Sequence, residues 1–299
     1  MAFNQRSDFL WKRQTAGDKL FTGIIYAALV LVCMITLLPI LQVVTVSLSP
    51  NDVVGQYGLH LFPTRISLSG YEKVLQFKPI WTAYLNTIIR SALGIVITQV
   101  LLALGAYPLS KKYLPNRGFW TFLVLLTMYF SGGIVPNYIL ITKYLKLRNT
   151  VWALVLPAAV NAYTLVIVRN FFEAIPDSLE ESARIDGASE WRVLTSIVIP
   201  LSKPVIATTA LWSLVYHWNT WLDCMLYISD ASRYVLQLVL RQILLQGQLQ
   251  DMNIMTQVSV NNDTMKMATL VVSILPVIVI YPFLQKYFVK GVMIGAVKG

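Results

Sequence analysis

Polar side chains that could do chemistry are few in this 299-residue chain, and most of them stand alone. The two histidines, His60 and His217, have no catalytic or metal-binding partners at a useful spacing. The two cysteines, Cys33 and Cys224, lie inside apolar runs and are interpreted as small buried hydrophobic residues. The sequence therefore predicts no disulfide, no metal centre and no catalytic residue.

One polar group recurs at helical spacing inside an apolar run. Its members are separated by four, three and four residues, so one helical face would carry them all: Trp212, Tyr216, Asn219 and Asp223. Aromatic rings and amides bind sugars by stacking and hydrogen bonding, so this stripe is a candidate substrate path. The open alternative is helix packing held by polar side chains. Arg90, in another apolar run, could join this path by meeting an anionic sugar or by pairing with Asp223, but we expect it to snorkel to the membrane interface.

The segment 169–204 concentrates polar residues between two apolar runs. Ser178 and Glu181 have the spacing of a capping box, so a short helix is expected to begin just after Pro176. Gly187 is suited to end that helix with a left-handed residue.

A second helix in this segment is expected from about Ser189 until Pro200 stops it. Two short amphipathic helices joined at a glycine would make a compact knob, which could also be an ordinary structured loop. Six of the 14 acidic residues of the chain gather there: Glu173, Asp177, Glu180, Glu181, Asp186 and Glu190.

The elements that must position these residues are apolar helices. Six stretches without Asp, Glu, Lys or Arg have about the 20 residues that a helix needs to cross a bilayer. The predicted spans lie near residues 21–48, 81–109, 119–142, 149–168, 205–228 and 267–288. Outside them are tails at 1–20 and 289–299, outer loops at 49–80 and 229–266, and the inner loop at 169–204. Breakers inside several spans, such as Gly132-Gly133 and Pro157, are more typical of a transporter or channel than of a simple anchor.

The composition indicates that membrane lipid is the main solvent of this chain. Only 13% of the residues are charged and 56% are hydrophobic, whereas a soluble chain carries about 25% charged residues. A soluble enzyme is therefore excluded. The net charge of +10 does not indicate nucleic acid, because the basic residues form short clusters between apolar runs. If both ends are inside, the inner segments hold 14 basic residues and the outer loops hold 9, which favours cytoplasmic termini.

Two motifs carry a family resemblance. Glu181-Ser182-Ala183, three residues, Gly187, nine residues and Ile197-Val198-Ile199-Pro200 resembles the EAA loop of binding-protein-dependent ABC importer permeases. That pattern is EAA, three residues, G, nine residues and I-x-L-P, so Ser182 and Ile199 are the departures from it. The end of the chain, from Tyr287-Phe288-Val289-Lys290-Gly291 to Gly295-Ala296-Val297-Lys298-Gly299, resembles the tail of the carbohydrate, maltose-type branch.

The resemblance implies an all-α polytopic membrane protein with six transmembrane helices and the MetI-like type I ABC importer permease fold. It also implies contact with an ATPase through two sets of residues. The coupling set in the loop is Glu180, Glu181, Ala183, Asp186, Gly187, Ile197 and Pro200, and the tail set at the ATPase dimer is Gly295, Lys298 and Gly299.

The function implied is that of a permease subunit that imports sugars or oligosaccharides by alternating access. No G-x-x-x-x-G-K-[ST] loop occurs, so ATP and Mg are expected on partner subunits and no cofactor on this chain. The expected partners are a second permease, two ATP-binding cassette subunits, an external or periplasmic solute-binding protein and membrane lipid, without nucleic acid. The expected location is the bacterial inner membrane.

Nine basic and five acidic residues in the outer loops would suit acidic fragments of alginate or pectin as the substrate. Two alternatives are a single-component secondary transporter and a polytopic membrane glycosyltransferase or acyltransferase. The first should show inverted repeats with intramembrane acids, and the second should gather Asp, Glu, His or Cys near one membrane face.

Overall fold

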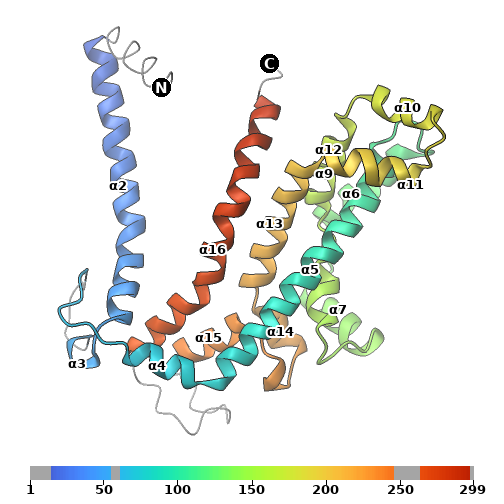
Figure 1. Ribbon diagram of the computed structural model, residues 1–299. Helices are drawn as coiled ribbons and strands as arrows, with labels where there is room; N and C mark the ends of the chain where they lie inside the picture. The colour runs from blue at the N-terminus through green and yellow to red at the C-terminus, as the bar shows by residue number, and fades with distance from the viewer. Residues whose placement is uncertain (1–14, 55–60, 246–262, 297–299) are drawn as a thin grey trace. The chain divides into compact units, whose positions relative to one another are not determined.

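The computed structural model describes residues 15–54, 61–245 and 263–296, and all regular secondary structure in those ranges is helical (Figure 1). The chain divides into two compact units. Unit 1 comprises residues 1–74 and 261–271, and unit 2 comprises residues 75–260 and 272–299. Among the described residues, three helices are long and apolar enough to span a membrane, and three bent helix pairs raise the number of candidate spans to six.

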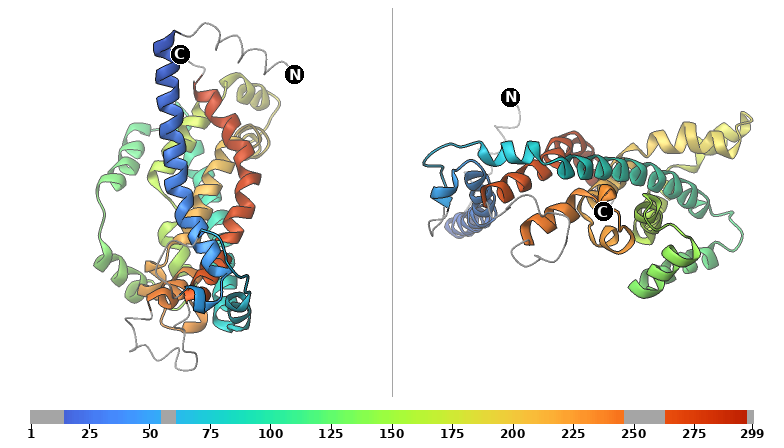
Figure 2. Two further views of the ribbon diagram at one scale, coloured as in Figure 1. Left: turned by 90° about the vertical axis from the view of Figure 1, so that its left-hand side faces the viewer. Right: turned by 90° about the horizontal axis from the view of Figure 1, so that it is seen from below.

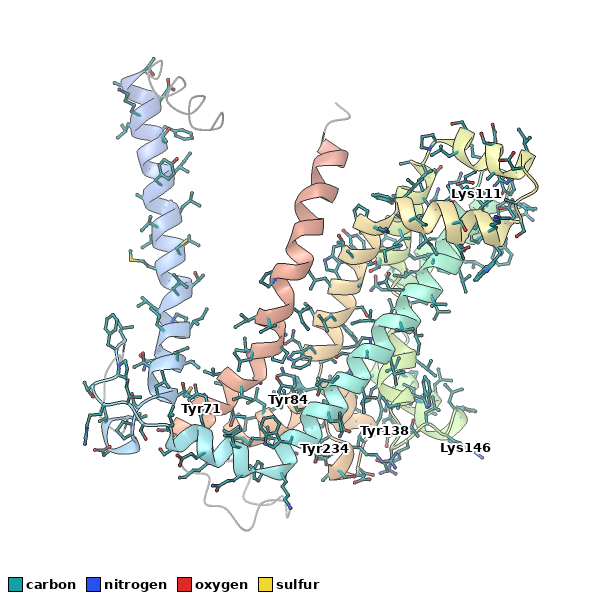
Figure 3. The ribbon with its side chains drawn as sticks, in the orientation of Figure 1. Tyr71, Tyr84, Lys111, Tyr138, Lys146 and Tyr234 are labelled. Carbon is teal, nitrogen blue, oxygen red and sulfur yellow. The ribbon has the colours of Figure 1, made fainter. Side chains whose placement is uncertain are left out.

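Unit 1 contains a long helix whose sides are apolar and exposed, as a lipid-facing helix requires. This helix, α2 (Ala16–Ser47), begins at a capping box between Thr15 and Asp18, which the sequence analysis did not identify. Cys33 is exposed on it, so the expectation that this cysteine is buried is wrong. The hydroxyls of Ser47 and Tyr71 lie 2.8 Å apart and join α2 to α4 (Figure 3). The other helices of unit 1 are α3 (Asn51–Val54), most of α4 (Ser69–Gln76) and the start of α16 (Asp263–Ala296).

Unit 2 is built around α5 (Lys78–Ser110), which packs against α9 (Ala162–Glu173), α13 (Lys203–Asn219) and α15 (Leu236–Leu245). The remaining elements, in chain order, are α6 (Arg117–Tyr129), α7 (Ile134–Ile139), the π-helix η1 (Leu140–Tyr144), α8 (Trp152–Val155), the 3₁₀-helix η2 (Leu156–Ala158), α10 (Asp177–Ile185), α11 (Glu190–Val193), the π-helix η3 (Leu194–Val198), α12 (Ile199–Leu201), α14 (Leu222–Tyr227) and the 3₁₀-helix η4 (Ala231–Arg233). The C-terminal part of α16 belongs to unit 2 as well. Figure 1 shows α10 and α11 near the C-terminal end of α5, with α14 and α15 near its N-terminal half. We call these the α10 end and the α14 end of unit 2.

Three pairs of consecutive apolar helices are sharply bent where they meet. α6 and α7 with η1 meet at 108°, α8 with η2 meets α9 at 54°, and α11 with η3 and α12 meets α13 at 81°. The first bend is at Gly133, whose φ of +82° is in the left-handed region that favours glycine. The breakers at Gly132-Gly133 therefore do interrupt the helix. Figure 2 shows α6 and α7 at the edge of unit 2, and neither helix has a fully buried side chain.

Two apolar clusters hold unit 2 together. At the α10 end, side chains of α5, α9, α11 and η3 form one cluster, whose most buried members are Leu102, Ala106, Phe172, Val193 and Val198. At the α14 end, α8, α14 and α15 contribute Ala153, Leu154, Cys224, Tyr227 and Leu238 to another. Cys224 is fully buried there, as expected. Segments near both ends of α5 are therefore fixed by packing, which lets polar side chains be positioned around it.

Candidate functional site

The first helix of the loop 169–204 is α10, and its two ends are set by different residues. Pro176 occupies the N-cap position without a side-chain hydrogen bond, so the predicted capping box at Ser178 is wrong. Proline already supplies the extended residue before the helix, which leaves Ser178 within the first turn. At the other end Gly187 has φ +80°, and the Ala188 N–H donates to the carbonyl of Ala183 at 2.9 Å. The left-handed glycine turn is confirmed.

The second helix of the loop ends beside Pro200. Its N-cap is Ser189, whose side chain accepts the N–H of Arg192. The expected stop at Pro200 is confirmed to within one residue, because the helix ends at Leu201 and meets α13 at 81°. The wider π turn of η3 comes just before Pro200, and in it the Ile199 N–H donates to the carbonyl of Leu194. Pro200 then occupies the first turn of α12, where its missing N–H is tolerated.

A group of side chains, the loop network, fastens this loop to α5. Its members are Tyr107, Lys111, Tyr113, Glu180, Arg184 and Glu190. Lys111 donates to both carboxylate oxygens of Glu180, and the two residues are only 7% and 2% exposed. Arg184 donates to Glu180 at 3.2 Å and to Glu190 at 2.8 Å. Glu190 accepts from the hydroxyl of Tyr107, which returns the network to α5 (Figure 3 labels Lys111).

The electrostatics of the loop favour the charged forms of Glu173, Arg184 and Glu190. The Arg184 guanidinium donates a hydrogen bond to Glu190 and holds the pKa of that carboxyl below its usual range. Arg117 does the same for Glu173, whose pKa is also lowered. The pKa of Arg184 is raised, chiefly by its bond to Glu190. Hydrogen bonds between charged groups are about twice as strong as neutral ones, so the loop is held firmly at neutral pH.

The predicted coupling residues separate into an inner and an outer set. Glu180 points inward to Lys111 and supports the loop from within. Glu181, Asp186, Gly187 and Pro200 are exposed, while Ala183 and Ile197 are half-buried. Three large apolar side chains also lie exposed on the loop, at 46%, 86% and 64%: Leu179, Ile185 and Trp191. The loop thus offers a mixed acidic and apolar outer surface.

The predicted stripe of polar residues is interrupted in the structure. α13 ends at Asn219, and Asp223 lies on the next helix, α14, so the prediction that all four residues share one helical face is wrong for Asp223. Side-chain hydrogen bonds to the backbone explain the break. Thr220 donates from its hydroxyl to the carbonyl of Tyr216 at 2.8 Å, and its own carbonyl accepts from Arg90 at 2.9 Å.

Trp212 and Tyr216 line a cleft of about 400 Å³ between α5, the bend of α8 with α9, and α13. Asn219 is exposed and does not line it. The full lining is Thr98, Pro157, Ala158, Val160, Asn161, Tyr163, Thr164, Thr209, Trp212, Ser213, Tyr216 and His217. The cleft mixes aromatic rings with hydroxyl, amide and imidazole groups.

Arg90 does not snorkel. It is fully buried and forms an ion pair with Asp223, whose side chain is 18% exposed. It also donates to the carbonyl of Thr220. The expectation that Arg90 reaches the membrane interface is therefore wrong, because a carboxylate and a backbone carbonyl at the helix break bind the two terminal guanidinium nitrogens inside the protein.

Sequence reasoning missed several residues of the cleft. His217 has no chemical partner nearby in the sequence, yet it lines the cleft and packs against Gly94 of α5. The available signal was the four-residue spacing of Thr209, Ser213 and His217, a polar stripe beside the one that was chosen. Thr98 comes from another helix, so no local spacing could have revealed it.

The predicted tail residues are mostly not described. Gly295 lies in α16, whereas Lys298 and Gly299 are outside the described residues. Across residues 15–54, 61–245 and 263–296, no group of three or more His, Cys, Asp or Glu side chains could hold a metal ion.

Comparison with known proteins assigns this architecture. Residues 114–294 match the family model described as binding-protein-dependent transport system inner membrane component. The polygalacturonan/rhamnogalacturonan transport system permease protein YtcP of Bacillus subtilis (strain 168) is 40% identical over 285 residues, which are 94% of this chain and 99% of that protein. Protein LplC of the same organism is 39% identical over 89% of this chain and 90% of its own length.

Solved structures of ABC transporter chains are also similar to this chain. A chain from a bacterial ABC transporter involved in the import of the acidic polysaccharide alginate superposes with a TM-score of 0.85 and 32% identity, covering 92% of this chain and 99% of that one. A chain from a bacterial alginate ABC transporter in complex with a periplasmic protein that carries an alginate pentasaccharide has a TM-score of 0.59 at 15% identity, which shows a shared fold alone.

Proposed function

Because this chain belongs to the family of binding-protein-dependent transport system inner membrane components, we propose that it is the permease subunit of an ATP-driven importer of acidic oligosaccharides. It is a multi-pass protein of the inner membrane. Its cargo is a uronate-containing fragment of pectin or alginate type. The similarity to YtcP, a polygalacturonan/rhamnogalacturonan permease, and to a chain of an alginate importer supports this choice.

The loop 169–204 is the surface that receives force from the ATPase. The observation that carries this assignment is that one side of α10 is bound to the α5 terminus while the other side is exposed. Glu180 on its inner side is bound to Lys111 of the α5 terminus, whereas Glu181 on its outer side is exposed. Glu181 and Asp186 orient the loop on the ATPase through charge-assisted hydrogen bonds. The exposed Leu179 and the half-buried Ala183 contribute apolar contacts.

Transport proceeds by alternating access. Closure of the ATPase pair displaces α10, and the loop network passes the displacement to α5, α9 and α13 because these helices share one packed cluster. The cleft lined by Trp212 and Tyr216 then opens to one side of the membrane and afterwards to the other. Arg90 and Asp223 form an internal bond near this path and do not contact the cargo.

The complete transporter contains partners that supply what this chain lacks. Two ATP-binding cassette subunits hold ATP and Mg, a second permease completes the path, and an external or periplasmic solute-binding protein delivers the cargo. Both termini of this chain are cytoplasmic, and the tail with Gly295, Lys298 and Gly299 reaches the ATPase dimer. The positive bias of the inner segments supports this orientation.

Reconstitution tests the proposal. Proteoliposomes that contain this chain, a second permease, the ATPase and the binding protein should take up trigalacturonate only when ATP is supplied. Glu181→Lys should lower this uptake about tenfold, the effect of losing a charge-assisted hydrogen bond, with normal membrane insertion. Glu72→Lys is the matched control, since Glu72 is exposed on α4 outside the loop. Uptake by this chain alone without ATP would contradict the proposal and favour a secondary transporter.

A further inference from the structure

The cleft between α5, α9 and α13 holds three polar atoms that are buried and have no hydrogen-bond partner in the protein. They are the hydroxyl oxygens of Thr98 and Ser213 and Nδ1 of His217. The three residues are 7%, 8% and 1% exposed. Unpaired buried polar groups are rare and costly in native proteins, so three in one cleft indicate a partner from outside the chain.

The same cleft carries no formal charge. None of its lining residues is Asp, Glu, Lys or Arg. The buried cation at the α14 end, Arg90, is already matched by Asp223 and by the carbonyl of Thr220. A carboxylate that entered the cleft would therefore find donors for hydrogen bonds but no opposite charge.

We propose that this cleft binds the hydroxyl-bearing part of a sugar ring and does not distinguish a uronate from the corresponding neutral sugar. The inference rests on the proposed function and sharpens it: selection for acidic cargo lies elsewhere in the transporter. Thr98, Ser213 and His217 bond to ring hydroxyls, while Trp212 and Tyr216 offer aromatic faces to the ring. The volume of about 400 Å³ is in the range of small-molecule sites.

A sugar ring fits the lining better than a lipid chain does. A lipid chain could cover the aromatic side chains but would leave the three polar atoms without partners. A sugar ring has both an apolar face and a rim of hydroxyls, which matches two partly exposed aromatic residues (39% for Trp212 and 48% for Tyr216) beside three buried polar ones.

Binding to the purified permease and ATPase complex tests this inference, with quenching of tryptophan fluorescence as the readout. The two probes are trigalacturonate and the trigalactose obtained by reducing its carboxyl groups. Both should bind, with Kd values within about threefold of each other. Thr98→Val and Ser213→Ala should each weaken the binding of both probes by the same factor, about twofold to tenfold for one lost hydrogen bond.

Ser91→Ala is the matched control. The Ser91 hydroxyl is also buried on α5 without a partner, and the residue is 3% exposed, but it does not line the cleft. This variant should bind both probes as the unmodified complex does. Equal binding by Thr98→Val, Ser213→Ala and the unmodified complex would overturn the inference, as would binding of the acidic probe alone or of neither probe.

The proposed function is tested separately by uptake. If the complete transporter fails to take up trigalacturonate with ATP, the proposed function is wrong. If uptake is normal and both cleft variants keep normal affinity for both probes, only the inference about the cleft is wrong.

Discussion

Two consecutive lysines at the end of α5 have opposite environments. Lys111 is buried and bound to Glu180, whereas Lys112 is exposed and only 3.7 Å from the exposed Asp177. A buried ion pair becomes costly when one partner is removed, because the other charge remains in a medium of low dielectric constant. An exposed pair contributes little. Adjacent residues of one type therefore have different structural importance.

Lys111→Met should destabilise unit 2 by about 3 kcal/mol, near the lower end of the range for breaking a buried pair, and should loosen the loop. Lys112→Met should change stability by less than about 1 kcal/mol. Thermal unfolding in detergent measures the stability of both variants. Tryptic cleavage after Arg184 measures how far the loop has loosened. Similar melting temperatures for the two variants would show that the burial of Lys111 has no energetic importance.

Protonation of Glu190 should release the loop from α5. Its pKa is lowered, first because Arg184 donates a hydrogen bond to it, so folding favours the carboxylate. The resulting stability is fully present above the ordinary glutamate value of about 4.3, and it is lost as the pH falls through the lowered pKa. The fluorescence of Trp191, the next residue along the chain, should report this change below about pH 4.3.

Glu190→Gln removes the titrating group and should abolish that part of the fluorescence change. The difference between the two titration curves isolates Glu190 from Glu173, whose pKa is also lowered. Identical curves for the two proteins would mean that Glu190 does not hold the loop.

Among the helices, α5 depends on one close approach. A Cβ atom at Gly94 would lie 2.2 Å from Nε2 of His217 on α13, which is closer than van der Waals contact allows. Gly94→Ala should therefore force α5 and α13 apart and cost about 1–3 kcal/mol, the usual penalty for overpacking. Gly118→Ala on α6 is the control, since nothing lies within 4 Å of its Cβ position. The melting temperatures of the two purified variants measure the difference.

The existence of the helices and the bend at Gly132-Gly133 could be predicted from the sequence, but the break at Thr220 could not. Apolar runs indicate spans because hydrocarbon excludes charge, and the breakers at Gly132-Gly133 are at a bend. The helix end beside Pro200 could also be predicted, whereas the π turn before it could not. The break at Thr220 depends on Arg90, which is 130 residues away in the sequence, so no local pattern contains it.

The candidate site also has some features that the sequence predicts and others that it does not. Gly187 could be identified because its left-handed turn is a local requirement of the backbone. The inward orientation of Glu180 depends on Lys111, which lies 69 residues away. The polar lining of the cleft combines helices that meet only in the folded protein. Local geometry is therefore predictable from spacing, whereas contacts between distant segments need the structure.

On the scale of unit 2, one ion pair involves the N-terminal half of α5 and another lies just beyond its C-terminal end. Arg90 pairs with Asp223 of α14, and Lys111 pairs with Glu180 of α10. The two basic residues are 21 positions apart, about 31 Å along a helix. A single helix therefore connects the loop proposed to receive force with the break beyond the cleft.

Arg90→Met alone should reduce assembly of the transporter strongly, because Asp223 would keep a charge without its partner. The double variant Arg90→Met with Asp223→Leu should recover most of the assembled complex, since both charges are removed together. Yield from size-exclusion chromatography and a double-mutant cycle measure the coupling. Additive losses in the double variant would show that the two residues act independently.

The pairing of the buried cations of α5 also has an electrical consequence. Across a membrane potential of 100 mV, each elementary charge that crosses gains or loses about 2.3 kcal/mol. Arg90 and Lys111 are each accompanied by a carboxylate from a neighbouring helix of the same unit. When α5 moves together with these helices, each of the two pairs displaces positive and negative charge in equal amounts. These two buried pairs therefore add no net gating charge to such a motion.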